Sequence, residues 1–335
     1  MTDPIASFEG VQDAARQIAD AAVRTPLLES EALNERLGGR VLMKAENLQV
    51  IGAFKFRGAY NRISRLTDAE KARGVVAYSS GNHAQAVTAA ARAVGTTAII
   101  VMPADSPAVK VEGVRHYGGE IRLYDRYRES REGIGEEIAR TRGSVLVRPF
   151  DDPFVIEGQG TAGLEMIEDA RAMGAEYDQL LCGTSGGGLI AGVNLAFEAL
   201  SPQTVVHGVE PALYNDTQLS LAAGERLTYA PVETPGICDA LMTDRPGELT
   251  FPINRRRLAG IVTVTDAEVA EAVRFAFRWL KLVVEPGGAV SLAAVLAGKV
   301  ETKGLTTGVV LSGGNIDPRL FSAIIEDRFT PGGAL

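Results

Sequence analysis

Lys55 is the residue whose surroundings most clearly suggest chemistry. It lies within residues 51–59, an apolar, glycine-containing stretch in which a solvated ammonium group is out of place. Burial disfavours the charged form of a lysine and lowers its pKa, and the free amine can then attack a carbonyl group to form a Schiff base. The alternative is a lysine whose stem lies along the core while its ammonium reaches water.

A second candidate segment, residues 79–86, lies where a predicted strand ends and a predicted helix begins. Free N–H groups at a helix start attract anions, and Ser, Asn and His side chains add further donors. The segment therefore predicts a binding site for a substrate carboxylate, formed by Ser79, Ser80, Gly81, Asn82 and His83. An ordinary strand-to-helix turn capped by Asn82 is the alternative.

A glycine-rich turn follows the apolar residues 180–182. Consecutive glycines let several N–H groups converge on one phosphate, helped by the positive end of the following helix dipole. The turn lacks both the P-loop ending and the dinucleotide spacing, so it predicts a site for a single terminal phosphate. The candidate residues are Ser185, Gly186, Gly187, Gly188 and Leu189. Residues 158–163 match the dinucleotide pattern formally, but no good strand precedes them, and we interpret them as a tight turn into a helix.

Ser312 ends a strongly apolar late segment, at the place where open α/β sheets present ligand-binding groups. A serine hydroxyl can hydrogen-bond a ring nitrogen without forcing a proton onto it, whereas an aspartate would favour protonation. A serine that simply ends a strand before a glycine turn is the alternative.

The elements that would position these residues alternate between short β-branched runs and longer segments of helical period. This pattern is typical of a doubly wound α/β protein with parallel strands. The predicted strands are Val41–Lys44, Gly74–Ser79, Ala98–Met102, Gln179–Cys182, Val205–Val209, Ile261–Val264 and Gly308–Leu311. The stretch from Gly74 to about Val147 has its own alternation and is predicted to form a smaller lobe.

Composition narrows the classes of partner. The chain has 335 residues and a net charge of −8 without a long block of like charges, which disfavours binding to nucleic acid or to an anionic membrane. Its two cysteines are too few for a disulfide framework or a zinc site. The chain shows neither a signal sequence nor a membrane-length apolar run. We expect a cytoplasmic protein that acts on a small molecule.

Taken together and in this order, the segments resemble the fold-type II family of pyridoxal-phosphate enzymes, specifically its threonine/serine dehydratase and serine racemase branch. The resemblance covers nearly the whole chain, with matching stretches at residues 44–49, 52–59, 79–86, 158–161, 185–189, 210–211, 285–287 and 312–317. It implies a tryptophan synthase β-like architecture of two lobes, each with a mainly parallel sheet flanked by helices. A large cofactor-binding domain would comprise residues 1–70 and 150–335, and a small substrate-clamping domain residues 71–149.

The resemblance also implies roles around pyridoxal 5'-phosphate. Lys55 would hold the cofactor as a Schiff base and then remove the substrate α-proton, with Phe54 lining the cofactor ring. Asn82 would lie near the 3-hydroxyl group and Ser312 near the pyridine nitrogen. Residues 185–189 would bind the phosphate.

Two further residues would act on the substrate. Ser80 matches the serine that family racemases place on the opposite face of the substrate, where it could return a proton. Arg131 matches an arginine that reaches the substrate side chain in the racemases. Arg126 and Arg128 flank the same region, and arginines there would favour a second carboxylate, as in 3-hydroxyaspartate. Ordinary surface charge is the alternative for all three arginines.

A metal site is implied at Glu210, the Tyr214 carbonyl and Asp216, where members of the family with a metal place their ligands. Hard cations prefer such oxygen ligands, so Mg²⁺, or Mn²⁺ or Ca²⁺, is expected there. Asn215 stands where an acidic residue is common, which reduces the local negative charge.

The predicted function is that of an ammonia-lyase, which eliminates the β-hydroxyl of threonine, serine or 3-hydroxyaspartate to give a 2-oxo acid and ammonia. Ala240 stands where relatives often carry glycine over the cofactor face, so threonine is not assumed. The alternatives are a serine or aspartate-type racemase, a β-replacement enzyme, and a phosphate-binding protein in which Lys55 is only a counter-charge. A homodimer is expected, and the end of the chain at Leu335 leaves no room for a C-terminal regulatory domain.

Overall fold

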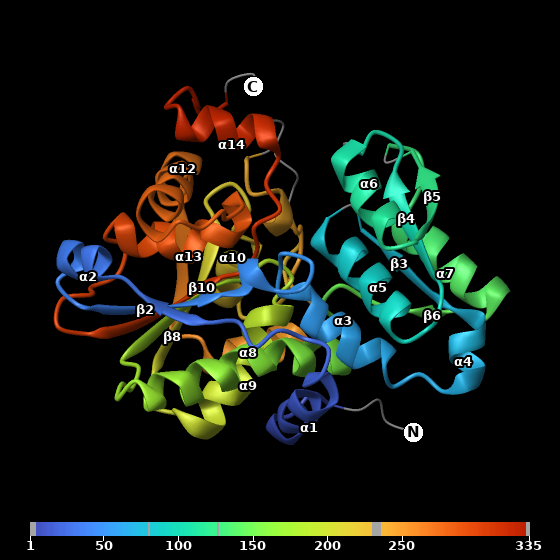
Figure 1. The fold of residues 1–335 in the computed structure, drawn as a ribbon, viewed down its shortest axis with the longest axis horizontal. Coiled ribbons are helices and arrows are strands. Elements are labelled where there is room, and N and C mark those ends of the chain that lie inside the picture. The colour runs from blue at the N-terminus through green and yellow to red at the C-terminus, as the bar shows by residue number, and fades with distance from the viewer. Residues whose placement is uncertain (1–4, 80, 107, 126, 230–235, 333–335) are drawn as a thin grey trace.

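The computed structural model describes residues 5–79, 81–106, 108–125, 127–229 and 236–332. These residues form two lobes that lie side by side, each built on its own sheet (Figure 1). Neighbouring strands are parallel except for one antiparallel pair, and helices flank both sheets. The predicted two-lobed α/β architecture is therefore confirmed.

The larger sheet has six strands in the order β1-β2-β10-β7-β8-β9. Only β1 runs antiparallel to its neighbour β2. The strands are Leu27–Glu29 (β1), Arg40–Ala45 (β2), Gln179–Gly183 (β7), Val205–Pro211 (β8), Gly260–Val264 (β9) and Thr306–Leu311 (β10). Alternate residues of β2 face opposite layers of the core: Val41 and Met43 pack on one side and Leu42 on the other.

The smaller sheet has four parallel strands in the order β5-β4-β3-β6. They are Val75–Tyr78 (β3), Ala98–Pro103 (β4), Glu120–Tyr124 (β5) and Val145–Leu146 (β6). One face, with Val75 and Ile100, packs with the buried alanines of the following helix, and the other face, with Val76, packs against Ile134 and Ile138.

Helices cover both faces of the larger sheet (Figure 1). In chain order the α-helices are Phe8–Ile18 (α1), Glu31–Leu37 (α2), Lys55–Ile63 (α3), Asp68–Arg73 (α4), Asn82–Ala93 (α5), Ala108–His116 (α6), Arg131–Arg142 (α7), Pro153–Ala172 (α8), Gly188–Leu200 (α9), Asp216–Ala223 (α10), Thr250–Arg257 (α11), Asp266–Phe275 (α12), Pro286–Leu296 (α13) and Pro318–Ile325 (α14). Short helical turns are Glu46–Leu48 (η1), Asp239–Leu241 (η2) and the π-helical Ala276–Leu280 (η3). No helix among these described residues is long and apolar enough to cross a membrane.

The glycines at residues 158–163 are not a turn, as the sequence suggested, but lie inside α8. A Cβ atom at Gly158 would approach Gly58 Cα of α3 to 2.6 Å, and one at Gly160 would approach the Gly192 carbonyl oxygen of α9 to 2.7 Å. These glycines therefore allow close approach of the helix backbones. The dinucleotide-like pattern is a helix-packing motif.

Every strand predicted from the sequence is present, and the carboxyl ends of the parallel strands point to shared edges of their sheets. Segments that carry candidate residues follow β2, β3, β7 and β10 at these edges. Ligand-binding groups of open α/β sheets are expected at this position. The fold thus places the segments after β2, β7 and β10, which are distant in the chain, at one edge of the larger sheet.

Candidate active site

Lys55 is the first residue of α3, the helix that lies between the two lobes in Figure 1. Lys55 Nζ donates a hydrogen bond to the Pro149 carbonyl oxygen at 2.8 Å and lies 5.0 Å from the centroid of the Phe54 ring. Burial lowers the pKa of Lys55 to about 8. A substantial fraction of the amine is therefore neutral near physiological pH, as a nucleophile or a base requires.

A buried charged cluster around Arg57 holds the first turn of α3. The Arg57 guanidinium is fully buried and binds Glu46 at 2.8 Å and Glu165 at 2.7 Å, while Lys44 binds Glu165 at 2.6 Å. Burial opposes the charge of Arg57, but the two carboxylates hold its pKa above the usual value. Isolated buried charges are strongly unfavourable, so these groups stabilise one another. The sequence did not predict this cluster.

The glycine turn has the backbone of an anion cradle. Ser185 and Gly187 have positive φ angles of 51° and 90°, and α9 begins at Gly188. The Thr250 hydroxyl donates to the Gly186 carbonyl oxygen at 2.6 Å, and Asn254 Nδ2 donates to that of Gly187 at 3.3 Å. These contacts hold the turn in place at the first free N–H groups of α9, where an anion is favoured.

Ser312 is held next to Lys55 by its backbone. Its carbonyl oxygen accepts a hydrogen bond from the Phe54 N–H at 3.0 Å, and its own N–H donates to the Gly288 carbonyl oxygen at 3.3 Å. The adjacent Gly313 forms an isolated bridge with Ala53. The start of α3, the end of β10 and the start of α13 are thus tied together.

Asn82 is the first residue of α5 and connects the lobes through its side chain. Its Nδ2 donates to Glu285 Oε1 at 2.6 Å, and its Oδ1 accepts from Asn315 Nδ2 at 2.8 Å. Burial, followed by the charge of Asp239, raises the pKa of Glu285 to about 8. In the sequence, Glu285 belongs to a stretch that matches the family, but no role is predicted for it. The structure adds that its buried carboxyl group contacts Asn82.

His83 is buried directly after Asn82. Its Nε2 donates to the Val147 carbonyl oxygen at 2.9 Å, while Nδ1 has no hydrogen-bond partner among the described residues. Burial, followed by the charge of Lys55, lowers the pKa of His83 to about 3. The imidazole of His83 is therefore neutral near physiological pH.

The structure describes only some of the remaining candidates for substrate binding. The Gly81 N–H donates to Ser79 Oγ at 3.1 Å, which shapes the turn before α5. Ser80 and Arg126 lie outside the described residues. Arg131 begins α7, donates to Glu132 at 2.8 Å and lies 5.9 Å from the centroid of the Tyr78 ring.

The carboxylates predicted to bind a metal lie at the end of β8 and the start of α10. Both are buried; Glu210 accepts hydrogen bonds from two backbone N–H groups, whereas both carboxylate oxygens of Asp216 lack partners among the described residues. Burial raises the pKa of Glu210 to about 7, and burial with the charge of Glu210 raises that of Asp216 to about 8. Within the described ranges, no group of three or more His, Cys, Asp and Glu side chains could hold a metal.

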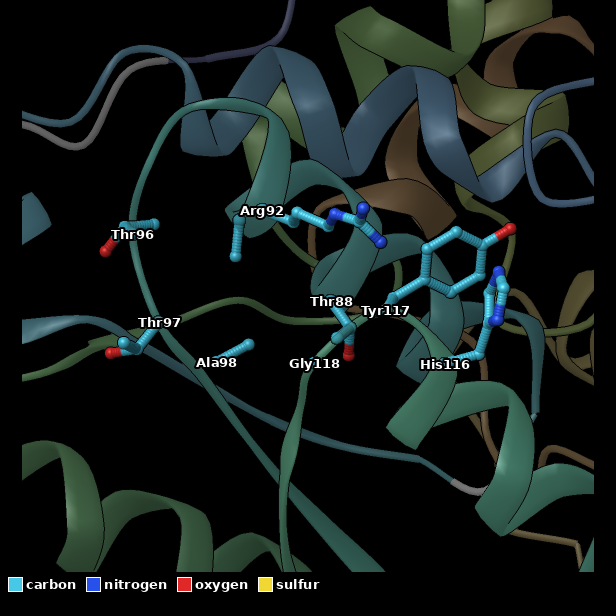
Figure 2. A pocket seen from close by; sticks show the side chains of 9 residues that line it. Thr88, Arg92, Thr96, Thr97, Ala98, His116, Tyr117 and Gly118 are labelled. Atoms are coloured by element: carbon cyan, nitrogen blue, oxygen red, sulfur yellow. The ribbon is translucent and has the colours of Figure 1, made fainter.

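A separate cavity of about 360 Å³ lies in the small lobe (Figure 2). It is lined by Thr88, Ala91, Arg92, Thr96, Thr97, Ala98, His116, Tyr117 and Gly118. None of these residues belongs to the predicted site.

Comparisons with known proteins identify the family. The profile described as "Pyridoxal-phosphate dependent enzyme" matches residues 18–313. An "L-threo-3-hydroxyaspartate ammonia-lyase" of Pseudomonas sp is 42% identical over 96% of this chain and 99% of the relative. A protein of the same name from Saccharomyces cerevisiae is 41% identical over 97% of this chain and 98% of the relative. Among solved structures, a threonine deaminase from T.th. has a TM-score of 0.86 at 44% identity and covers 93% of this chain and 99% of its own.

The chain therefore belongs to the fold-type II pyridoxal-phosphate enzymes, in the family of threonine deaminases, serine racemases and hydroxyaspartate ammonia-lyases. The family that the sequence segments resemble is confirmed.

Proposed function

We propose that this enzyme removes water from a dicarboxylic β-hydroxy amino acid, 3-hydroxyaspartate, and releases a 2-oxo acid and ammonia. By class the chain is a pyridoxal-phosphate-dependent ammonia-lyase of the hydroxyaspartate and threonine dehydratase type, as the sequence predicted. The names of the two relatives described above support 3-hydroxyaspartate over threonine or serine. The observation that carries the proposal is the buried amine of Lys55, which contacts Pro149, while the glycine turn packs at Gly186 against the next residue, Phe150.

The described residues fit pyridoxal phosphate. Lys55 would bind the cofactor covalently, Phe54 would line its ring, Asn82 would meet the 3-hydroxyl group and Ser312 the ring nitrogen. Residues 185–189 would bind the phosphate, because the turn combines positive φ angles with a helix start. When bound, the cofactor accepts the electron pair left when the substrate loses its α-proton.

Lys55 also supplies the base. Its pKa of about 8 matches a group that must take a proton from the substrate α-carbon and give it up again near neutral pH. The Pro149 carbonyl oxygen holds the Nζ atom at 2.8 Å, so the free amine has a fixed resting position. A positioned base of this kind typically contributes roughly 10² to 10⁴-fold to a rate.

The turn before α5 would bind the α-carboxylate of the substrate through Ser79, Ser80, Gly81, Asn82 and His83. The helix start provides N–H donors for this carboxylate. Residues 71–149 would form a domain that closes over the substrate and excludes water, and residues 1–70 and 150–335 would form the cofactor-binding domain. Serine racemases are also among the relatives, at 39% identity in one case. Racemisation, with Ser80 as the second proton donor, is therefore the second candidate function.

A divalent cation fits the site at Glu210, the Tyr214 carbonyl and Asp216. The support is Asp216, whose two buried carboxylate oxygens lack protein partners in the described parts of the chain. A hard cation such as Mg²⁺ would offset the free-energy cost of burying two neighbouring carboxylates, with waters completing its coordination shell. The cation would stabilise the loop and take no part in the chemistry.

A second copy of the chain is proposed to cover an exposed apolar surface around η3. Trp279 is 62% exposed and Phe277 and Val283 are also exposed, although large apolar side chains are usually buried. Homodimerisation would remove them from water. Both the dimer and the cytoplasmic location stay predictions.

The reaction is tested by measuring 2-oxo acid release from separate samples of L-threo-3-hydroxyaspartate, L-threonine and L-serine by the cofactor-loaded enzyme. We expect the highest kcat/KM for 3-hydroxyaspartate. Release from none of the three substrates by a visibly cofactor-bound protein would overturn the elimination and favour racemisation or β-replacement.

A further inference from the structure

The end of β3 gathers two guanidinium groups, and only one of them belongs to the predicted site. Tyr78 is the last residue of β3 and directly precedes the proposed carboxylate-binding turn. The Arg131 guanidinium lies 5.9 Å from the Tyr78 ring centroid, and Arg148 interacts with the Tyr78 hydroxyl. Two positive charges therefore converge on one side chain beside the substrate site.

The backbone around Arg148 is part of the candidate active site. Val147 continues the pairing of β6 with β3, since its N–H donates to the Val76 carbonyl oxygen at 2.9 Å. The Val147 carbonyl oxygen accepts from His83 Nε2 at 2.9 Å, and the Pro149 carbonyl oxygen accepts from Lys55 Nζ at 2.8 Å. Arg148 lies between these two contacts. The backbone of Arg148 is therefore held within one residue of the contacts that His83 and Lys55 make.

Apart from its contact with Tyr78, Arg148 has no close ion pair in the described parts of the chain. Its nearest carboxylate is Glu136 at 3.9 Å, at the outer limit of an ion pair, and the Arg148 and Glu136 side chains are 49% and 63% exposed. An exposed pair of this geometry contributes little to stability. Arg131, in contrast, donates to Glu132 at 2.8 Å. The guanidinium of Arg148 is therefore available to an incoming anion.

We propose that Arg148 is a specificity-determining residue that, together with Arg131, binds the second carboxylate of a dicarboxylic substrate. A planar guanidinium can form two parallel hydrogen bonds with a carboxylate, and two such groups that both contact Tyr78 match one carboxylate better than a hydroxymethyl side chain. Serine and threonine leave both guanidiniums without this partner. This inference rests on the proposed elimination reaction and names the group that selects its substrate.

The test compares R148Q with the wild-type holoenzyme on two substrates. We expect kcat/KM for 3-hydroxyaspartate to fall about tenfold or more, as for loss of one charge-assisted contact, and kcat/KM for L-serine to stay within about twofold. R148K keeps the positive charge but lacks the planar guanidinium that can donate two parallel hydrogen bonds. It should therefore give an intermediate loss of kcat/KM for 3-hydroxyaspartate. The matched control is R142Q, because Arg142 is an exposed arginine of the same lobe that pairs with Glu120 at 3.3 Å. It should leave both substrates unchanged.

An equilibrium readout separates this inference from the proposed function. L-Aspartate has no β-hydroxyl to eliminate, so its inhibition constant against L-serine turnover reports binding of the second carboxylate alone. R148Q should raise that constant about tenfold and leave that of L-alanine unchanged. If the wild-type enzyme does not turn over 3-hydroxyaspartate, the proposed substrate is wrong, but the aspartate measurement still tests Arg148. An equal effect of R148Q on both substrates and both inhibitors, or no effect, would overturn the inference.

Discussion

The Asn82 side-chain amide donates to Glu285 Oε1 at 2.6 Å and so joins the start of α5 in the small lobe to the start of α13 in the large lobe. Asn315 Nδ2 donates both to the Ile51 carbonyl oxygen and to Asn82 Oδ1, each at 2.8 Å. Because a carbonyl oxygen can only accept, this chain of contacts fixes which end of the Asn82 amide faces Glu285. One N–H of Asn82 is thereby committed to Glu285.

The first prediction concerns the pH dependence of stability that Glu285 causes. Its folded-state pKa of about 8 is raised above the ordinary value, so between roughly pH 4.5 and 8 the native state binds more protons than the unfolded state. Stability from this group is therefore present at low pH and is lost as pH rises towards 8, with a slope of at most about 1.4 kcal/mol per pH unit. E285Q mimics the neutral acid and should remove this slope. Thermal unfolding of both proteins from about pH 5 to 9 checks it, and parallel curves would contradict it.

The second prediction concerns the glycine turn. Gly187 has a φ angle of 90°, and a Cβ atom there would lie 2.6 Å from Asn254 Nδ2 and 2.8 Å from Thr250 Oγ1. G187A should displace the turn and weaken cofactor binding about tenfold or more, as measured by titrating the apoenzyme with pyridoxal phosphate.

The control for the turn is G174A. Gly174 also has a positive φ angle, of 67°, but a Cβ atom there would meet nothing within 4 Å. This variant should carry a similar backbone strain of about 1 kcal/mol and bind the cofactor as the wild type does. Equal cofactor affinity of G187A and the wild type would show that residues 185–189 do not hold the phosphate.

The third prediction concerns the buried charged cluster around Arg57. R57A leaves Glu46 and part of Glu165 without their partner in the core, so the free energy of unfolding should fall by about 3–5 kcal/mol. Denaturant unfolding of R57A measures the change. R16A, which removes an exposed arginine paired with Asp13, should change it by less than about 1 kcal/mol. A small loss in R57A would mean that the cluster does not anchor α3.

The fourth prediction concerns the metal. If a divalent cation binds Glu210 and Asp216, Mg²⁺ should raise the Tm of the wild-type protein at about pH 8 relative to EDTA, because a ligand that binds only the folded state stabilises it. D216N should lose most of this response, since it replaces a carboxylate by a neutral amide. The same Mg²⁺ response in both proteins would place any bound cation elsewhere.

Much of the fold was predictable because buried parallel strands carry apolar runs, such as the whole of β4 and residues 309–311 at the end of β10. The strands missed were β1 and β6, which have three and two residues, and β5, whose burial pattern is mostly exposed because it lies at a sheet edge. The glycines of residues 158–163 were misinterpreted because a glycine pattern alone does not show whether the backbone turns or packs closely against another helix. The packing role is shown by the close approach of Gly158 to Gly58 and of Gly160 to Gly192.

The candidate site could be proposed segment by segment, but its connections could not. Glu285 lies 203 residues from Asn82 in the chain, and no local pattern indicates that their side chains meet. Arg148 is likewise ordinary in the sequence, and becomes a candidate only because the carbonyl groups on either side of it contact His83 and Lys55. Tertiary contacts of this kind need the folded structure.

The most direct test of the central claim is to locate the covalent bond between cofactor and protein. The purified holoenzyme is reduced with borohydride, digested and analysed by mass spectrometry, with K55A treated in parallel. We predict the reduced cofactor on the peptide that contains Lys55, and neither yellow colour nor adduct in K55A. An adduct on another lysine, such as Lys44 or Lys110, or normal colour in K55A, would contradict the assignment of Lys55 as the cofactor-binding residue.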